Sequence, residues 1–451
     1  MSASLTPLSP EQRMWRWKVL ISTYFAYAGF YLVRKVFTIC KSTLAKPIEE
    51  GGFGMGFDQV ANIWTAYLVA YMLGQFVNSF IGRKYGPRVL LLGGLGLSIV
   101  CNVIFGFANS YHTFFLFMFF NGIVQAAGWP GCVGSVAQWL RKNDRGTIMG
   151  IWSTNYQIGN IAVKMIGGFL LGHYSTVYSG VYGVRYAFWG CTVMAFAVWW
   201  LVYFWQRTSP KDVGLDAIVH NEAHADKSVE ATDAESVTFS EFLKLFLNPV
   251  VPMMGLGYFC IKFLRYALDS WLPTFLDLQG MNVDSAAYYS SIFDWTGFVG
   301  AIVTGVALDR MFRGRWDRVC LVLGVGLVFG YVAVTRFGGN PYTLSFLFGF
   351  VGFMLYGIDT LLNGAAAVVV AGERNAVAVT GLINGIGSIG PIVQEQVIGR
   401  LISGEAPADA IHNSNLLGLS MSITYLLLMA LIVVQTSRRH RRYASRLQGA
   451  A

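Results

Sequence analysis

The feature that most constrains this chain is a series of about a dozen apolar stretches, each roughly 20 residues long and able to cross a lipid bilayer as a helix. They lie at 18–40, 60–82, 88–109, 112–140, 146–172, 185–206, 250–276, 285–308, 318–336, 341–370, 376–401 and 413–435. Hydrophobic residues make up 55% of the chain and charged residues only 13%, which excludes an ordinary soluble globular protein. We therefore predict an all-α membrane protein with 12 transmembrane helices.

A polar segment divides the predicted spans into two sets of six. Acidic residues recur from Asp212 to Glu235 without an aromatic residue, as in a solvated linker. We predict an N-terminal half at 1–206, a linker at 207–249, a C-terminal half at 250–437 and a basic tail at 438–451. His220 and His224 have the spacing of a helical metal pair, but a flexible polar segment does not preorganise one. We predict no metal site and no cofactor.

Basic residues gather in alternate loops and in the tail: Arg83, Lys84 and Arg88; Arg141, Lys142 and Arg145; Arg310, Arg313, Arg315 and Arg318; Arg438, Arg439, Arg441, Arg442 and Arg446. These loops share one side of the membrane if the helices alternate, and the positive-inside rule makes that side the cytoplasm. The net charge of +9 then reflects topology and not a nucleic-acid partner. We predict cytoplasmic termini and, from the short loops, a bacterial inner membrane protein, with the endoplasmic reticulum as the alternative.

Two arginines lie inside predicted spans, where a cation is costly. Arg34 lies in the first span and Arg265 in the seventh, so each half carries one early in its sequence. A cation at membrane depth costs several kcal/mol unless it faces a polar cavity and finds a partner. The guanidinium fork matches phosphate geometry. The pair therefore indicates a shared anionic cargo.

Five segments resemble organophosphate:phosphate antiporters of the major facilitator fold: 30–37 (FYLVRKVF), 122–132 (GIVQAAGWPGC), 262–269 (KFLRYALD), 291–297 (SIFDWTG) and 384–390 (NGIGSIG). The resemblance implies two six-helix halves around one central site. It also implies rocker-switch exchange of an organic phosphate, such as hexose 6-phosphate, for inorganic phosphate. By this resemblance Arg34 and Arg265 are the phosphate arginines, and the protein is a transporter and not an enzyme.

The chain departs from the glycerol-3-phosphate branch of that family at three positions. Gln75 stands where that branch has a lysine in the second span, Tyr156 where it has a histidine in the fifth, and Gly131 where it has a second proline. These differences argue against glycerol 3-phosphate as the cargo and remove one proposed ligand cation.

Further candidates share helix faces with one another. Tyr156, Asn160 and Lys164 are spaced i, i+4, i+8, so all three could line a site, or Lys164 could snorkel to the outer headgroups. In span seven, Lys262, Tyr266 and Asp269 share one side with Arg265. Asp269 could neutralise Arg265 permanently or form a pair that cargo disrupts. Other lining candidates are Tyr27, Tyr31, Gln75 and Gln125.

The C-terminal half also carries three acids at membrane depth, Asp294, Asp359 and Glu395. They either compensate Lys262 and Arg265 or couple transport to protons. The expected partners are a phosphate ester, inorganic phosphate and the lipid bilayer, and we predict a monomer. The alternative function is a sensor on the same fold, which would bind external hexose phosphate and signal to a membrane kinase.

Overall fold

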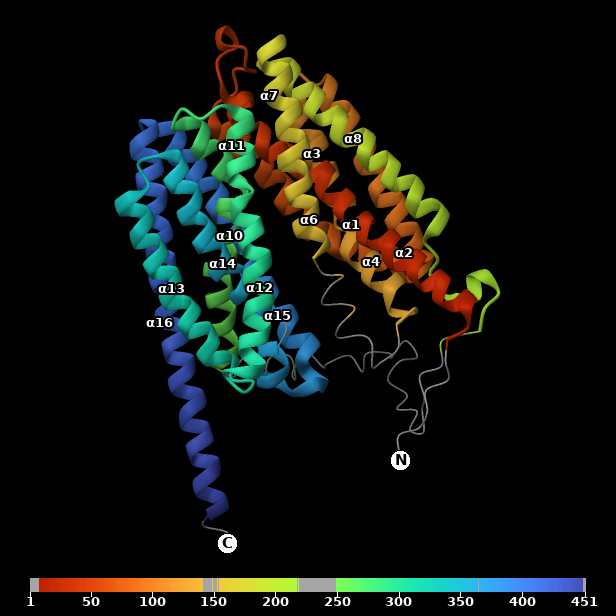
Figure 1. The fold of residues 1–451 in the computed structure, drawn as a ribbon, viewed down its shortest axis with the longest axis vertical. Helices are drawn as coiled ribbons and strands as arrows, with labels where there is room; N and C mark the ends of the chain where they lie inside the picture. Colours follow the sequence, from red (N-terminus) through yellow and green to blue (C-terminus); the bar gives the residue numbers. More distant parts are fainter. Residues whose placement is uncertain are drawn as a thin grey trace. The chain divides into compact units, whose positions relative to one another are not determined.

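The computed structural model describes residues 8–140, 148, 152, 154–216, 218, 249–363 and 365–448. By their contacts its described helices form two compact units: the first holds α1 to α4, α6 to α8 and α11, and the second holds α10 and α12 to α16. Figure 1 labels these helices along the chain. The predicted basic loop at Arg141, Lys142 and Arg145 lies outside the described residues, as does most of the predicted linker.

The first unit begins with the long helix α1, whose N-terminus is capped by two side chains. Ser9 and Gln12 form a reciprocal capping box at the start of α1, which satisfies two backbone amides that have no partner within the helix. Two predicted spans lie within α2, which is interrupted at Gly86, where a φ of 81° favours glycine. The helices are α1 (Pro10–Ala45), α2 (Phe57–Phe107), α3 (Tyr111–Gln125), α4 (Gly128–Ala137), α6 (Asn155–Ala162), the π-helical turn η3 (Val163–Gly167), α7 (Gly168–Val177) and α8 (Gly180–Trp205).

The remaining helices cover the six predicted C-terminal spans. They are α10 (Val250–Leu278), α11 (Val283–Ser290), α12 (Ile292–Arg310), α13 (Trp316–Phe337), α14 (Pro341–Asn363), α15 (Ala365–Gly404) and α16 (Pro407–Gln448). The predicted tenth span at 341–370 begins where α14 begins, at Pro341, and the residue between α14 and α15, Gly364, lies outside the described residues. By its contacts α11 packs on α7 and belongs to the first unit.

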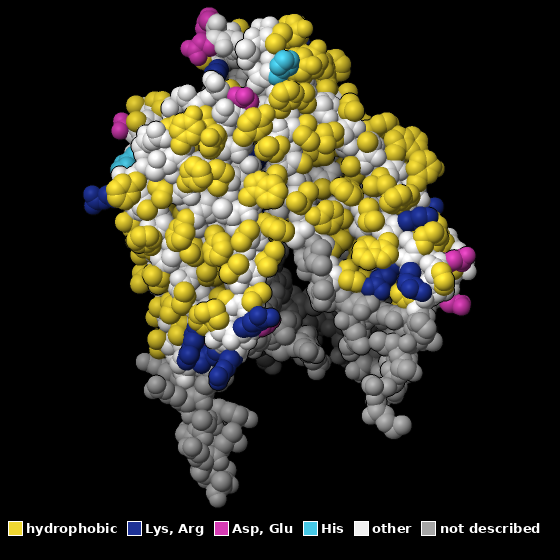
Figure 2. Space-filling model, in the orientation of Figure 1, with side chains coloured by type: hydrophobic (Ala, Val, Ile, Leu, Met, Phe, Trp, Pro, Cys, Tyr) yellow, Lys and Arg dark blue, Asp and Glu magenta, His cyan; other side chains and the backbone are white. Residues whose placement is uncertain are grey.

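Seven helical segments of the described chain are long and apolar enough to cross a membrane by length and composition alone. Neither α1 nor α10 is among them, because each carries charged residues inside its apolar stretch. On α12, Val299, Ile302 and Val306 are half-exposed along one stripe, as expected of a lipid-facing surface. Figure 2 shows hydrophobic side chains over most of the visible face.

The start of the predicted linker contacts the first unit. Trp139 Nε1 donates to the Arg207 carbonyl at 3.1 Å, and Gln12 Nε2 donates to the Asp216 carbonyl at 3.1 Å. Between these contacts Ser209 and Asp212 form a second capping box. Asp212 is solvent-exposed and also caps this short helix.

Close packing of α12 on α14 depends on Gly300. A Cβ atom added there would lie 2.2 Å from the Phe353 carbonyl oxygen, whereas one added at Gly305 on the same helix would meet nothing within 4 Å. We expect Gly300→Ala to destabilise the purified protein by about 1–3 kcal/mol, as overpacking does. Gly305→Ala is the matched control and should leave the thermal unfolding midpoint unchanged or raise it, because alanine is the better helix former. Equal midpoints for the two variants would contradict this packing.

Candidate functional site

Arg34 lies in the middle of α1, and its side chain is held in place by neutral groups. The residue is 6% exposed. Its Nε donates to Gln125 Oε1 of α3 at 3.2 Å. Three tyrosine rings surround its Cζ atom, with centroids at 4.6 Å for Tyr31, 5.0 Å for Tyr71 and 5.9 Å for Tyr67. Cation–π contacts of this kind hold the guanidinium without neutralising it.

Gln125 is itself fixed by a polar network that orients its oxygen towards Arg34. Its Nε2 donates to Ser98 Oγ at 2.6 Å and to the Phe30 carbonyl at 3.2 Å. Ser98 in turn donates to Asn121 Oδ1 at 2.5 Å. With both amide hydrogens used, the carbonyl end of Gln125 is the end available to Arg34.

The terminal Nη2 of Arg34 is buried and donates no hydrogen bond within the described chain. No carboxylate of the described residues lies within ion-pair distance of the guanidinium either. A buried donor without a partner is unfavourable by about 1–3 kcal/mol, and more when it is charged. Among the described residues, Nη2 of Arg34 is thus a buried charged donor without a hydrogen-bond acceptor.

The other candidates of the first unit gather around the same helix. The Tyr31 ring lies 5.6 Å from that of Tyr27 and 6.1 Å from that of Tyr156, so these three tyrosines are neighbours. Asn160 is buried, at 3% exposed, on the helix that also carries Tyr156. Gln75 lies on α2 one turn beyond Tyr71, which contacts Arg34.

Lys164 does not have the position that snorkelling requires. Its side chain is 1% exposed, and Nζ donates to the Ser290 carbonyl at the end of α11 at 3.2 Å. The residue lies in η3, a π-helical turn of the kind that often marks functional sites. The Lys164 ammonium thus caps the end of α11 and contributes to packing within the first unit.

We expect the burial of Lys164 to be measurable by cysteine labelling. A membrane-impermeant thiol reagent should modify Lys164→Cys roughly tenfold or more slowly than Tyr178→Cys, because labelling a buried site requires an opening that is unfavourable. Tyr178 follows the same span and is 63% exposed. The six native cysteines are all buried, so their background should be low. Equal labelling rates would show that Lys164 faces the headgroups.

In the second unit Arg265 is neutralised by a carboxylate from another helix. Its Nη1 lies 2.6 Å from Asp359 Oδ2 of α14. The hydroxyl of Tyr258 donates to the other oxygen, Asp359 Oδ1, at 2.9 Å. Arg265 thus pairs with a carboxylate of a neighbouring helix, which helical spacing within α10 could not indicate.

Lys262 shares α10 with Arg265 but reaches a different neighbour. Its Nζ donates to Asn384 Oδ1 at 2.5 Å and to Ser388 Oγ at 3.1 Å, both on α15. The Tyr258 ring centroid lies 5.0 Å from Nζ. All three of these direct contacts are neutral groups.

The remaining candidates of the second unit are Tyr266, which contacts Arg265, and three buried acids, Asp269, Asp294 and Glu395. Tyr266 and Tyr356 contribute rings at 5.4 and 5.0 Å from Arg265 Cζ. Tyr356 also donates to Asp294 Oδ1 at 3.1 Å. Glu395 accepts from Ser270 at 3.0 Å and from Gln394 at 3.2 Å. Asp269 is buried at 4% exposed.

Sequence reasoning missed several residues that complete these two clusters, namely Tyr67, Tyr71, Ser98, Asn121, Tyr258, Tyr356, Asn384 and Ser388. The spacing of Tyr67 and Tyr71, one turn apart in the second span, was a signal for the first cluster. The hydroxyl and amide residues carried no such signal, because polar residues of that size occur throughout membrane helices.

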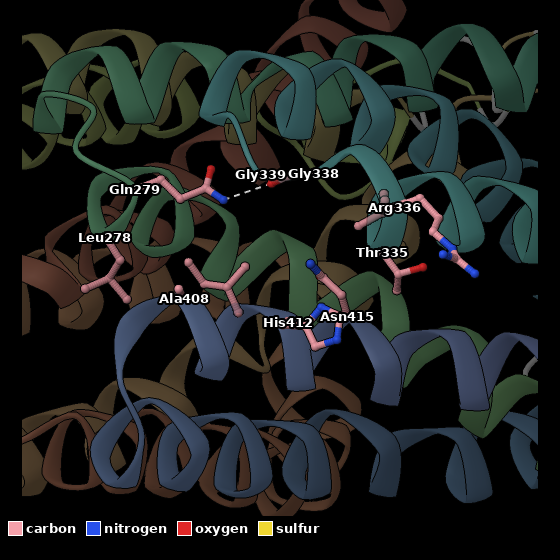
Figure 3. Close-up of a pocket in the computed structure, with 11 residues that line it drawn as sticks. Leu278, Gln279, Thr335, Arg336, Gly338, Gly339, Ala408, His412 and Asn415 are labelled. Atoms are coloured by element: carbon pink, nitrogen blue, oxygen red, sulfur yellow. Dashed lines mark hydrogen bonds between the residues drawn. The ribbon is translucent and has the colours of Figure 1, made fainter.

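A separate cavity of about 430 Å³ lies at one end of the second unit. It is lined by Gln279, which directly follows α10, by the end of α13, and by residues of α16 that include His412 and Asn415 (Figure 3). Gln279 Nε2 donates a hydrogen bond to the Gly338 carbonyl at 2.9 Å. None of the predicted site residues lines this cavity. Within the described chain, no group of three or more potential metal ligands was found.

Comparison with known proteins agrees with this architecture. The glycerol-3-phosphate transporter of Bacillus subtilis is 26% identical over 386 residues, which is 83% of each chain. Sugar phosphate exchanger 3 of Xenopus laevis is 29% identical over 364 residues, covering 72% of this chain and 70% of that protein. A probable hexose phosphate transport protein of Chlamydia muridarum is 27% identical over 377 residues, with 79% and 78% covered.

Solved structures show the same fold at low sequence identity. A nucleoside transporter superposes with a TM-score of 0.69 at 11% identity, covering 93% of this chain and 99% of that one. An inward-facing bacterial homologue of the lysosomal transporter Spinster also gives 0.69, at 16% identity, with 96% and 98% covered. These neighbours confirm the predicted fold class. The family model described as Major Facilitator Superfamily matches residues 19–394, so the chain belongs to this superfamily of membrane transporters, and the resemblance to organophosphate:phosphate antiporters is confirmed.

Proposed function

We propose that the protein is an organophosphate transporter that exchanges a phosphate ester for inorganic phosphate. The observation that carries this proposal is the state of Arg34, which is buried, charged and surrounded by neutral groups, with Nη2 lacking a partner in the described chain. A phosphate oxygen is the acceptor that a guanidinium fork fits best. Relatives named as glycerol-3-phosphate, sugar phosphate and hexose phosphate transporters support the same class of cargo.

A sugar phosphate is the proposed cargo, with hexose 6-phosphate as the leading example. The tyrosines near Arg34 and the amides Asn160 and Asn384 offer hydroxyl and amide groups suited to sugar hydroxyls. Arg265 is proposed to contribute hydrogen bonds to the phosphate from the second unit. Because phosphate is itself a charged cargo for the same site, exchange needs no separate coupling ion.

The transport cycle is proposed to be a rocker switch with alternating access, carried out by a monomer in a bacterial inner membrane. Both termini are proposed to be cytoplasmic. This topology places the arginine-rich loop between α12 and α13 on the cytoplasmic side, as the positive-inside rule requires. The membrane location follows from the superfamily and from the apolar helices.

Counterflow in proteoliposomes tests the proposal. Vesicles loaded with inorganic phosphate should take up labelled hexose 6-phosphate, and vesicles without internal phosphate should not. Competition by a panel of phosphate esters then ranks the cargo. Binding of the ester without counterflow would contradict an exchanger and support a sensor instead.

A further inference from the structure

We propose that the cavity between the end of α13 and the start of α16 binds the head group of an anionic phospholipid, whose acyl chains lie along these two helices. The cavity belongs wholly to the second unit, and none of the residues proposed to bind cargo lines it. The lipid that fits its lining is a phospholipid with a hydroxylated head group, such as phosphatidylglycerol. The inference is therefore independent of the proposed transport function.

The cavity has the volume and the charge of a site for a small anionic group. Its volume is about 430 Å³, and ligand pockets in proteins have roughly 300–1,000 Å³. Arg336 and His412 are among the eleven lining residues, and none of the eleven is an acid. Arg336 is exposed, so its side chain can turn towards an occupant. Asp409, in the first turn of α16, does not line the cavity, and the lining therefore complements a negative charge.

Polar groups without a protein partner line the same cavity. Asn415, which lies between Gln279 and Arg336 in Figure 3, is 5% exposed, and no hydrogen bond joins its side-chain amide to another described residue. Gln279 donates to the Gly338 carbonyl, whereas its Oε1 is buried and accepts from no described residue. Ala408 also lines the cavity from the first turn of α16, where backbone amides have no partner within the helix. A phosphate group would accept from the amides, and a head-group hydroxyl would donate to Gln279.

On α13, Arg336 ends an apolar stripe of the kind that faces lipid. Val325, Phe329 and Val332 precede it at i−11, i−7 and i−4, and all three side chains are exposed. Residues at these spacings share one face of a helix. The stripe therefore leads along the helix to the cavity that Arg336 lines.

On α16, His412 begins a second stripe of the same kind. Leu416, Ile423 and Leu427 follow it at i+4, i+11 and i+15, and they are exposed as well. The two helices pack on each other, and both stripes lead to the same cavity. A lipid with two acyl chains matches this arrangement, with its phosphate in the cavity and one chain along each helix.

An anionic phospholipid fits these features better than a free phosphate or a zwitterionic lipid. A soluble phosphate would leave both apolar stripes without a partner. Choline or ethanolamine would bring an ammonium group to a lining that contains no acid. Phosphatidylglycerol instead has a net negative charge for Arg336 and free hydroxyl groups for Gln279 Oε1.

Native mass spectrometry of the purified full-length protein tests the inference. The protein is mixed in detergent with equal amounts of phosphatidylglycerol and phosphatidylcholine that have the same acyl chains, and the measured quantity is the ratio of the two bound lipids. We expect the wild type to prefer phosphatidylglycerol. Arg336→Gln should lower this ratio roughly fivefold, as for the loss of one cation near a membrane surface.

Two further variants distinguish a built site from general attraction to positive charge. Arg318→Gln is the matched control, because Arg318 is also exposed on α13 but lies at the other end of that helix, and it should leave the ratio unchanged. Asn415→Leu keeps the charge and the approximate volume of the side chain. It should weaken the binding of phosphatidylglycerol roughly threefold or more through the lost hydrogen bond, whereas attraction to surface charge alone would not respond to this change.

A soluble head group separates a lipid site from a site for free phosphate. A large excess of glycerol 1-phosphate should not displace bound phosphatidylglycerol, because it lacks the chains that contact α13 and α16. Displacement would overturn the proposed lipid and assign the cavity to a soluble phosphate. Equal ratios in the wild type and Arg336→Gln, an equal fall in Arg318→Gln, or unchanged binding in Asn415→Leu would also contradict the inference.

Discussion

Replacing Arg34 with lysine should lower phosphate counterflow by about 100-fold or more, which corresponds to ~2.7 kcal/mol. Lysine keeps the positive charge but has a single ammonium in place of a planar fork. It cannot bind Gln125 through one edge and present a second edge to phosphate. The measurement is the initial rate of labelled phosphate uptake into phosphate-loaded proteoliposomes, at equal amounts of reconstituted protein.

Changes at Gln125 test whether phosphate binding depends on the absence of a carboxylate beside Arg34 among the described residues. Gln125→Glu is nearly isosteric and places a carboxylate where the amide oxygen lies 3.2 Å from Nε. The resulting ion pair should occupy the guanidinium and weaken competition by inorganic phosphate roughly tenfold or more. Gln125→Leu is the matched control, because it also loses the amide donors to Ser98 and Phe30 but adds no charge.

The two glutamine variants should therefore differ. A similar loss in both would mean that the amide network, and not the neutral surroundings of Arg34, governs phosphate binding. Normal counterflow in Arg34→Lys would remove Arg34 from the site altogether.

The second large effect is expected at the Arg265–Asp359 pair. Arg265→Gln leaves the Asp359 carboxylate buried with Tyr258 as its remaining described donor. Breaking one side of a buried ion pair typically destabilises a protein by about 3–5 kcal/mol. We expect a clear fall in the thermal unfolding midpoint of the purified protein, together with a loss of counterflow.

A double variant distinguishes the effect of Arg265 on thermal stability from its effect on transport. Arg265→Gln/Asp359→Asn removes both charges and leaves two side chains that can hydrogen-bond to each other. Thermal stability should return close to that of the wild type, while counterflow stays at least about tenfold lower, because the fork that donates to phosphate is absent. Wild-type counterflow in the double variant would show that Arg265 serves only to balance Asp359.

The residues that carry charge into the membrane were recognisable from the sequence because they break a strong pattern. Arg34, Lys262 and Asp359 each interrupt a run of apolar side chains, and such interruptions are costly enough to require a reason. The same logic located the spans themselves, since a helix must satisfy all its backbone hydrogen bonds in lipid. The superfamily match and the fold of the solved neighbours confirm the predicted fold class.

Which charge lies beside which could not be predicted in the same way. Helical spacing made Asp269 the natural partner for Arg265, because spacing describes only neighbours on one helix. The carboxylate of Asp359, which forms an ion pair with Arg265, is 94 residues away in sequence and lies on α14. Likewise, the sequence left two alternatives for Lys164, a residue that lines the site or one that snorkels to the headgroups. Its burial and its hydrogen bond to the Ser290 carbonyl are features of the tertiary structure alone.

By itself, the sequence determined that this chain is a bundle of membrane helices with buried cations early in each half. The length of an apolar stretch and the energetic penalty of a charge within it are properties of the local sequence. Both can therefore be recognised without the tertiary structure. Only the tertiary structure decided that Arg34 has neutral neighbours while Arg265 has a carboxylate. Charge compensation depends on distances of a few ångströms between different helices, and those distances are fixed by packing.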